Sequence, residues 1–268
     1  MFTLGSDPEV LLVNTDGKLI SSVGLVGGTK LRPQRTPHGY VQEDNVLVEF
    51  NTEPAQSEGA FVENTLNMIQ DINDIIVPLD LSVKIESSGL FDRDQLVTRQ
   101  AKIAGCEPDY DAWELSINRP PNLAATQLRT CGGHLHIGFQ GSEDDSLNRA
   151  YLVRIMDLVA GVPSVLMDGD TDRRSLYGKA GAHRPKYLAN GDSYDGVEYR
   201  TLSNFWISSK EHIAWAYRTV ERSLAEFTTL KEMVEEDRDT ITSAINYSDV
   251  DLAQDLVKKY DLEVICTT

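Results

Sequence analysis

The chain contains a pair of histidines whose spacing suits metal or phosphate binding. His134 and His136 are two residues apart in the segment Cys131–Phe139 and follow two consecutive glycines. In an extended strand, residues two apart point to the same face, and the glycines leave room for a ligand or another backbone to approach closely. Imidazole binds divalent metals and donates to phosphate. Taken alone, the pair is compatible with either a ligand site or a satisfied polar pair.

Three other segments place carboxylates at the same spacing of two residues. Their polar residues are Asp7 and Glu9, then Glu49, Asn51 and Glu53, and finally Glu198 with Arg200. Each segment alone could be a half-solvated antiparallel strand with its charges in water. If the polar faces converge, like charges raise one another's pKa values unless cations neutralise them. Oxygen-rich sites with one imidazole suit Mg²⁺ or Mn²⁺, so the four segments together predict a cup for magnesium and a nucleotide.

Positive charge is concentrated in one segment, Asp172–Lys186. Its basic residues are Arg173, Arg174, Lys179, His183, Arg184 and Lys186. Guanidinium groups bind phosphate through two parallel hydrogen bonds and offset charge on a transferring phosphoryl group. A solvated basic loop that balances an acidic protein is the alternative. The position of the segment between an apolar helix and the Glu198 strand favours a loop over the mouth of a pocket.

The order of these motifs resembles that of the glutamine synthetase and glutamate–cysteine ligase superfamily. More closely, the chain is similar to the phage-type carboxylate–amine ligases of type 2 in the segments Gly5–Glu9, Gly27–Lys30, Glu43–Asn45, Val48–Asn51 and Ala180–Lys186. The resemblance runs from about Gly5 to Trp206. It implies a glutamine-synthetase-like catalytic domain, in which a curved, mainly antiparallel sheet has helices packed on one face and the active site on the other.

The resemblance also implies roles for individual residues. Six match the metal-binding residues of the superfamily: Glu9, Glu49 and Glu53 on the amino-acid side, and Asp7, His134 and Glu198 on the nucleotide side. Four match residues that bind the nucleotide, namely His136, Arg174, Arg184 and Lys186, and three match catalytic arginines, namely Arg174, Arg184 and Arg200. Asp7 stands where classical glutamine synthetases have a glutamate, so its shorter side chain leaves room for a water between carboxylate and metal.

Such a site predicts an ATP-dependent carbon–nitrogen ligase that joins a carboxylate to an amine and needs Mg²⁺ or Mn²⁺. A carboxylate is a poor acyl donor, so ATP first converts it to an acyl phosphate, and divalent ions orient the phosphates. The predicted substrates are small-molecule or peptide carboxylates and amines. Two alternatives remain: a phosphotransferase acting on a guanidine or a carboxylate, and a non-catalytic protein that binds metal or nucleotide.

Length and composition agree with a single catalytic domain over residues 1–268. The 25 basic and 42 acidic residues give a net charge of −17, which argues against nonspecific binding to nucleic acid or to anionic membranes. A homo-oligomer is compatible with the sequence. The three cysteines form no CxxC motif, the N-terminus does not read as a signal peptide, and we expect no apolar run of transmembrane length. The expected compartment is the cytoplasm, which is the host cytoplasm if a phage encodes the chain.

Hydrophobic periodicity predicts an α+β fold. Strands are expected near residues 8–13, 18–24, 46–52, 82–87, 131–139 and 196–203, and helices over about 58–77, 145–167, 209–236 and 249–260. Ser57 can cap the first helix, and Pro163 should kink or interrupt the second. Strands with alternating polar faces favour an antiparallel sheet. Residues 88–130 read as a long irregular excursion that serves as a lid or a substrate-binding element.

Overall fold

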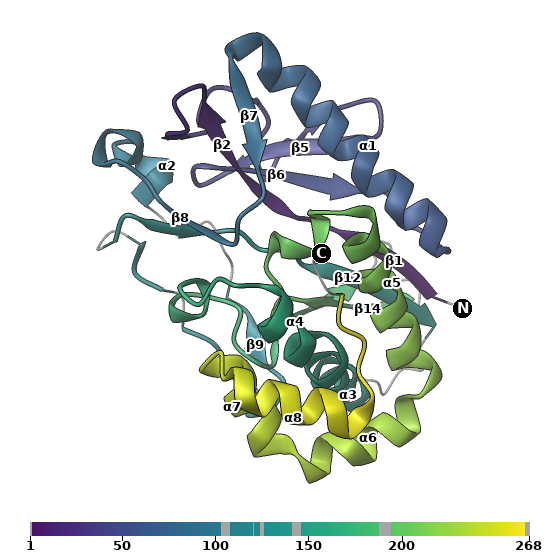
Figure 1. Cartoon of the computed structure of the whole chain (residues 1–268). Coiled ribbons are helices and arrows are strands. Elements are labelled where there is room, and N and C mark those ends of the chain that lie inside the picture. The colour runs from purple at the N-terminus through teal and green to yellow at the C-terminus, as the bar shows by residue number, and fades with distance from the viewer. Residues whose placement is uncertain are drawn as a thin grey trace.

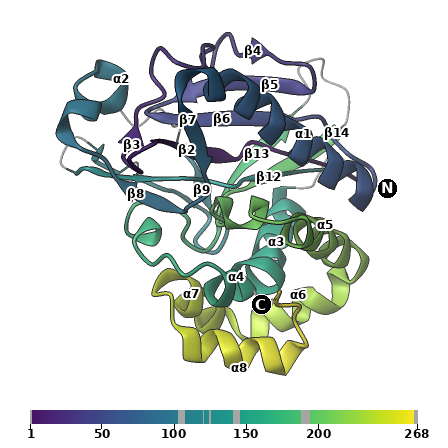
Figure 2. The same ribbon diagram turned by 45° about the horizontal axis from the view of Figure 1, so that its top comes forward.

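Two antiparallel sheets form the frame of the protein (Figures 1 and 2). The first sheet has the order β1 (Phe2–Ser6), β12 (Leu135–Gln140), β14 (Tyr194–Tyr199), β13 (Ala182–Tyr187), β9 (Tyr110–Asp111) and β10 (Ser116–Ile117). The second has the order β3 (Leu19–Ile20), β2 (Glu9–Asn14), β6 (Leu47–Thr52), β5 (Gly39–Asp44) and β4 (Gln34–Arg35), with β7 (Leu81–Lys84) also paired to β2. The computed structural model describes residues 2–102, 108–119, 121–123, 126–140, 146–187 and 194–265.

The chain passes from one sheet to the other at Asp7 and Pro8, between β1 and β2. Beyond the end of β1, the backbone still follows the segment that leads into β12. The amide of Asp7 donates to His134 O at 3.4 Å, and the amide of Glu9 donates to Gly132 O at 2.9 Å. The histidine segment therefore runs along the crossing between the two sheets, next to both acidic residues.

Helix α1 (Glu58–Ile76) covers the second sheet. It begins at Ser57, whose side chain accepts a hydrogen bond from the amide of Ala60, as expected for an N-cap. Its fully buried Phe61 and Ile72 belong to the same apolar cluster as Val48 and Phe50 of β6. These two residues face away from Glu49, so α1 packs on the face of β6 opposite the acids.

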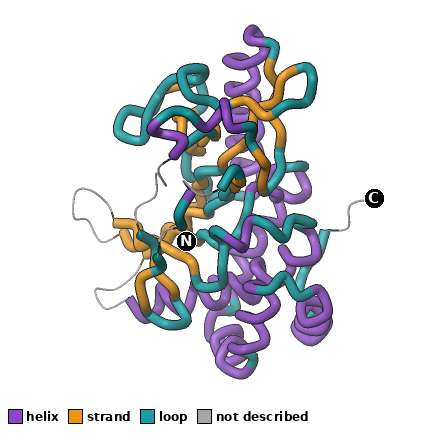
Figure 3. Tube along the Cα trace, turned by 90° about the vertical axis from the view of Figure 1, so that its left-hand side faces the viewer, coloured by secondary structure: helices purple, strands orange, loops and turns teal. Residues whose placement is uncertain are grey.

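Most of the remaining helices form a layer beside the first sheet. They are α3 (Ser146–Met156), α4 (Val162–Met167), α5 (Lys210–Ala225), α6 (Phe227–Glu236), α7 (Arg238–Asn246) and α8 (Val250–Tyr260). In this layer α3 packs against β13 and β14, and the others pack on one another. Figure 3 shows the helices largely on one side of the strands. The predicted α+β class, with helices on one face of antiparallel sheets, is confirmed.

Most predicted strands and the first helix are confirmed, with shifted ends. The predicted strand 18–24 is wrong in length, because only Leu19–Ile20 pairs with β2. The predicted helix 209–236 is two helices, which meet at Glu226, where the backbone leaves the helical region with φ −105° and ψ 18°. Helix α7 was not predicted. Its nine residues are fewer than the window of about 11–18 residues over which helical periodicity is recognised.

The second predicted helix is continuous but irregular. Between α3 and α4 the residues Asp157–Gly161 form a π-helical turn, and Pro163 lies in the first turn of α4. The expected interruption therefore falls just before Pro163, where a wider turn accommodates a residue that lacks an N–H. Read as one helix, Asn148–Met167 is long and apolar enough to cross a membrane by length and composition, which corrects the expectation that no run reaches that length. Because 83% of its apolar window is buried in the fold, it serves here as a core helix.

The predicted excursion over 88–130 is described only in part, since residues 103–107, 120, 124 and 125 lie outside the described residues. Its first part contains the 3₁₀ turn Arg93–Leu96 and the short helix α2 (Arg99–Lys102). The strands β8 (Ser88–Leu90) and β11 (Leu128–Thr130) pair with each other, and β9 joins the first sheet beside β13. The described part of the excursion is thus anchored to the body of the fold. Its role as a lid or a substrate-binding element stays a prediction.

Candidate metal and phosphate site

Strand register brings the predicted nucleotide-side residues into one row. His136 pairs with Glu198 across β12 and β14, and Arg184 pairs with Glu198 across β13 and β14. Cross-strand partners in an antiparallel sheet share a face. His136, Glu198 and Arg184 therefore point together toward the space beside Asp7.

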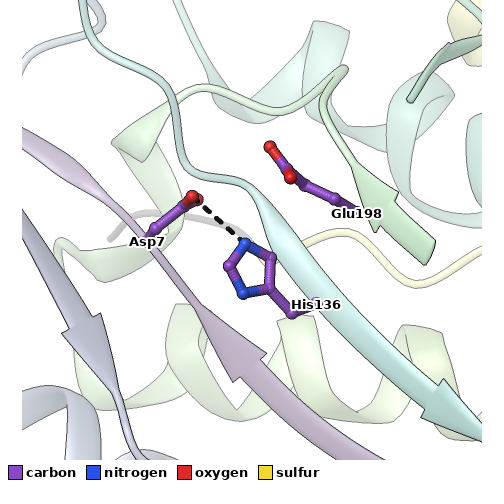
Figure 4. A group of neighbouring side chains, drawn as sticks. All are labelled: Asp7, His136 and Glu198. Atoms are coloured by element: carbon purple, nitrogen blue, oxygen red, sulfur yellow. Dashed lines mark ion pairs between the residues drawn. The ribbon is translucent and has the colours of Figure 1, made fainter. Parts of the chain in front are cut away.

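Asp7, His136 and Glu198 form the first cluster of potential metal ligands (Figure 4). Their ligand atoms lie within 4.8 Å of one another. Asp7 Oδ1 is 3.0 Å from His134 Nδ1, and Asp7 Oδ2 is 3.1 Å from His136 Nε2. Burial raises the pKa of Asp7, but the imidazoles of His136 and His134 outweigh it and hold that pKa well below its usual range. The cluster thus offers one ionised carboxylate, an imidazole and a second carboxylate.

Cations surround that second carboxylate, Glu198. Lys186 Nζ lies 2.8 Å from Glu198 Oε2, Arg184 approaches Oε1 at 3.6 Å, and Arg200 donates to Oε1. Burial and the charge of Asp7 raise the pKa of Glu198, whereas Arg200 and the two imidazoles lower it to a net value of about 2. These three basic side chains form a cationic rim next to the first cluster.

His134 lies behind this row and links its members. Its Nδ1 is 3.3 Å from the Arg200 guanidinium and 3.8 Å from Glu198 Oε1. Burial, followed by the charge of Arg200, lowers the pKa of His134 to about 4. His134 is therefore a neutral imidazole near pH 7, the form that can bind a metal.

A second cluster of three carboxylates faces the first. Glu9 of β2 pairs in register with Glu49 of β6, and Asp44 ends the adjoining strand β5. Their ligand atoms also lie within 4.8 Å of one another. The amide of Gly132 donates to Glu9 Oε2 at 2.6 Å, and Gln42 Nε2 donates to Glu49 Oε1 at 2.8 Å.

The second cluster carries unfavourable negative charge. Burial, reinforced by the charge of Asp44, raises the pKa of Glu9 to about 7. Burial and the charges of Asp7 and Glu9 raise the pKa of Glu49 well above its usual range. A divalent cation would relieve this repulsion, and three carboxylates are a donor set that suits Mg²⁺ or Mn²⁺. The residues present therefore fit a metal ion at each cluster.

All members of both clusters except His136 line one cavity of about 360 Å³. His136 lines a neighbouring pocket of about 420 Å³, which shares Lys186 with the first. The other polar and charged residues that line the first cavity are Lys30, Tyr40, Gln42, Asn51, His134, Arg184, Lys186 and Arg200. A smaller cavity of about 50 Å³ adjoins the first and shares Glu9, Asp44, His134 and Arg200. Acids that could hold cations and bases that could bind phosphate therefore face a single space.

The two glycines before the histidines allow close packing at this junction, as predicted. A Cβ on Gly133 would lie 2.5 Å from Trp206 Nε1 and would overlap Ser203 O. Trp206 Nε1 instead donates to Gly133 O at 2.9 Å. A Cβ on Gly132 would overlap Nε2 of the His134 ring, so glycine at 132 leaves room for the histidine and glycine at 133 leaves room for Ser203 and Trp206.

Two predicted site residues are not brought to the cavity. Glu53 is exposed and lies one residue beyond the end of β6 at Thr52. Arg174 lies in a 3₁₀ turn that directs its guanidinium into the helical layer, where it donates to the hydroxyls of Ser164 and Ser248 at 3.1 Å each. The other nine predicted residues all lie in or beside the cavity: Asp7, Glu9, Glu49, His134, His136, Arg184, Lys186, Glu198 and Arg200.

The sequence prediction missed Asp44 as a member of the second cluster. A signal was present, because Tyr40, Gln42 and Asp44 alternate along β5 at the same spacing of two residues as the other acids. The prediction also gave His134 the ligand position in the first cluster. The structure instead groups His136 Nε2 with Asp7 and Glu198 and leaves His134 hydrogen-bonded to Asp7.

Comparisons with known proteins give only distant structural similarity. No family model matches the chain, and no curated protein matches it. Among solved structures it is similar to a bifunctional glutathione synthetase from Pasteurella multocida, with 12% identity, a TM-score of 0.42 and coverage of 96% of this chain and 51% of that one. It is also similar to a GmaS/ADP complex, with 11% identity and a TM-score of 0.41; the match covers 98% of this chain and 71% of that one. A third similar structure is a novel glutamine synthase homolog, with 11% identity, a TM-score of 0.38 and coverage of 96% of this chain and 66% of that one. The chain thus spans about half the length of the first of these proteins, and similarity at this level assigns it no activity.

Proposed function

We propose that the protein is an ATP-dependent carboxylate–amine ligase that uses Mg²⁺ or Mn²⁺ and forms an amide or peptide-like bond. The observation that carries the proposal is the pairing of two clusters of metal ligands, all but His136 lining one cavity, with the cationic rim of Arg184, Lys186 and Arg200. A phosphoryl-transfer site needs both features, because the nucleotide phosphates and the cations that accompany them must be held together.

The two clusters offer different sets of ligand atoms, and each could hold one ion. Glu9, Asp44 and Glu49 would hold a cation through three oxygens, while Asp7, His136 and Glu198 would hold one through two oxygens and a nitrogen. When bound, such ions neutralise charge on the β- and γ-phosphate oxygens. Other groups of the chain would contact the phosphates directly.

Arg184 and Lys186 are the side chains best placed to bind those phosphates. Both lie on β13 and face the cavity, and both contact the Glu198 carboxylate. A phosphate group carries more negative charge than this carboxylate, so it could replace Glu198 as their partner. Arg200, which is buried and holds both Glu198 and Asp109, has less freedom. We therefore assign phosphate binding to the β13 pair and orientation of Glu198 to Arg200.

The proposed reaction has two steps. A carboxylate oxygen attacks the γ-phosphorus and releases ADP, which yields an acyl phosphate. The neutral amine then attacks the acyl carbon, phosphate leaves, and the nitrogen gives up a proton as the amide forms. The same proposal includes small-molecule or peptide substrates, a cytoplasmic location and the relationship to phage-type ligases.

The proposal is tested by ATP consumption with Mg²⁺ over pooled carboxylates and amines, followed by mass spectrometry of the product. We expect phosphate release that requires both an acid and an amine, and its loss in Glu49→Gln and Glu198→Gln. Glu53→Gln is the matched control, since this exposed glutamate lies outside the cavity. A phosphorylated product without an amide would instead indicate a phosphotransferase. ATP binding without turnover across the screen would indicate a binding protein.

A further inference from the structure

Asp157 lies in the core behind the first sheet and accepts four hydrogen bonds. Its side chain is fully buried, in the π-helical turn between α3 and α4. Oδ2 accepts from Trp113 Nε1 at 2.7 Å and from the amide of Gly181 at 2.6 Å. Oδ1 accepts from the hydroxyls of Tyr199 at 2.8 Å and Thr201 at 3.0 Å.

The four donors come from three segments that are distant in sequence, and each segment carries charged residues of the cavities. Tyr199 ends β14, and Tyr199 and Thr201 flank Arg200, whose guanidinium contacts Glu198 and Asp109 rather than Asp157. Gly181 directly precedes β13, which carries the phosphate-binding pair. Trp113 follows β9 and Asp109, whose carboxylate lies 3.2 Å from the Arg200 guanidinium.

The surroundings of Asp157 are shaped for these contacts. A Cβ on Gly161, four residues further along, would lie 2.7 Å from Ile245 Cδ1 and 2.9 Å from the Tyr199 hydroxyl, so glycine leaves the tyrosine room beside the carboxylate. Trp113 is held in turn by the Arg154 guanidinium, 5.4 Å from its ring centroid, and by Arg238, which donates to Trp113 O at 3.0 Å. π-helical turns often occur at functional positions in helices.

A buried carboxyl group is costly to the fold, and only a complete set of hydrogen bonds offsets the cost. An apolar side chain would fill the same helical position without that requirement. What Asp157 adds is a single point at which all three segments are held, in addition to their strand pairing and to pairwise contacts such as Arg200–Asp109 and Thr201–Lys179.

We propose that Asp157 is a positioning residue for the candidate site. By holding the Tyr199–Thr201 segment, the start of β13 and the Trp113 segment at one point, it fixes the distance between Glu198 and the basic residues around it. The proposal rests on the proposed function for its consequence in nucleotide binding, but its structural part can be tested independently.

The hydrogen-bond pattern provides a discriminating pair of variants. Both donors to Oδ2 are N–H groups, which cannot accept, whereas both partners of Oδ1 are hydroxyls, which can reverse. Asp157→Asn can therefore place its amide oxygen at Oδ2 and its NH₂ at Oδ1 and keep all four bonds. Asp157→Ala loses all of them. Leu230→Ala, in the fully buried core of α6, is the control for a general loss of stability.

The test combines two measurements on these variants and the wild type. Titration calorimetry measures MgATP binding, and hydrogen exchange with mass spectrometry follows residues 108–113, 181–187 and 196–201. We expect Asp157→Ala to weaken MgATP binding by about tenfold or more, as small displacements in a preorganised site do, and to speed exchange in all three segments. We expect Asp157→Asn to keep the MgATP affinity and the exchange rates of the wild type. We expect Leu230→Ala to lower the melting temperature without weakening MgATP binding.

Three results would overturn the proposal. The first is that hydrogen exchange in the three segments of Asp157→Ala is as slow as in the wild type. The others are that Leu230→Ala loses as much MgATP affinity as Asp157→Ala, or that Asp157→Asn keeps neither the wild-type affinity nor the wild-type exchange. If the wild-type protein does not bind MgATP, the proposed function fails. The exchange data then still decide whether Asp157 holds the three segments in place.

Discussion

Replacement of Glu9 by glutamine should stabilise the metal-free protein at alkaline pH. The change removes one of the three carboxylates of the second cluster, next to Asp44 and Glu49. It preserves shape and leaves an amide oxygen to accept the hydrogen bond from Gly132. Relief of repulsion should therefore outweigh the loss of the carboxylate.

The size of the effect follows from the pKa of Glu9, which is about 7 in the folded protein against an ordinary value of 4.5. A raised pKa means that the folded state holds the proton more tightly than the unfolded state. The associated stability is present below pH 4.5 and is lost as the pH rises through 7. The loss from this group is about 3 kcal/mol, so Glu9→Gln should exceed the wild type by up to about that amount at pH 8 and differ little from it at pH 5.

Urea unfolding at pH 5 and pH 8 in the presence of a chelator measures this difference. Addition of Mn²⁺ at pH 8 should then stabilise the wild type more than the variant, because the ion neutralises the cluster that the variant has already lost in part. The exposed Glu53→Gln serves as the control and should match the wild type at both pH values. Equal stability of Glu9→Gln and wild type at pH 8 without metal would refute the reasoning.

Three further outcomes are expected from other substitutions. Asp44→Asn should weaken Mn²⁺ binding by about tenfold or more, measured by calorimetry, while Glu53→Gln leaves the affinity unchanged. If Glu53→Gln weakened binding and Asp44→Asn did not, Glu53 would be the ligand, as the sequence predicted. Gly133→Ala should lower the unfolding free energy by about 2 kcal/mol or more in urea titrations, since its Cβ would overlap Ser203 O; wild-type stability would show that the junction is not tightly packed. Arg174→Met should lower the melting temperature but leave MgATP affinity intact, because the Arg174 guanidinium bonds to hydroxyls in the helical layer. A large loss of affinity would show that Arg174 contacts the nucleotide after all.

Alternation of residue types made much of the site predictable from the sequence. The spacing of two residues identified the faces that bear Glu9, Glu49 and Glu198, because a strand allows only two faces. That these faces would meet was a further assumption. It depended on the chain crossing from one sheet to the other at Asp7 and Pro8, for which the sequence offers only the proline as a hint.

The errors arose where strand ends and turns decide the direction of a side chain. Glu53 continues the alternation of Glu49 and Asn51 in the sequence, but β6 stops one residue earlier. Arg174 lies next to residues of the right type, yet a 3₁₀ turn rotates it away. Neither the end of β6 nor the 3₁₀ turn can be recognised from the alternation of residue types in the sequence.

The contacts of Asp157 were also beyond the sequence. Its partners are up to 44 residues away, and an isolated acid within an apolar helix gives no sign of which donors will meet it. Only the packing of α3 and α4 against the first sheet brings them together.

Anomalous diffraction from crystals grown with Mn²⁺ and ADP would test the central claim most directly. We predict manganese peaks at two positions, one among Glu9, Asp44 and Glu49 and the other beside Asp7, His136 and Glu198, with the diphosphate near Lys186 and Arg184. Manganese confined to exposed carboxylates, with both clusters empty at saturating Mn²⁺, would contradict the account.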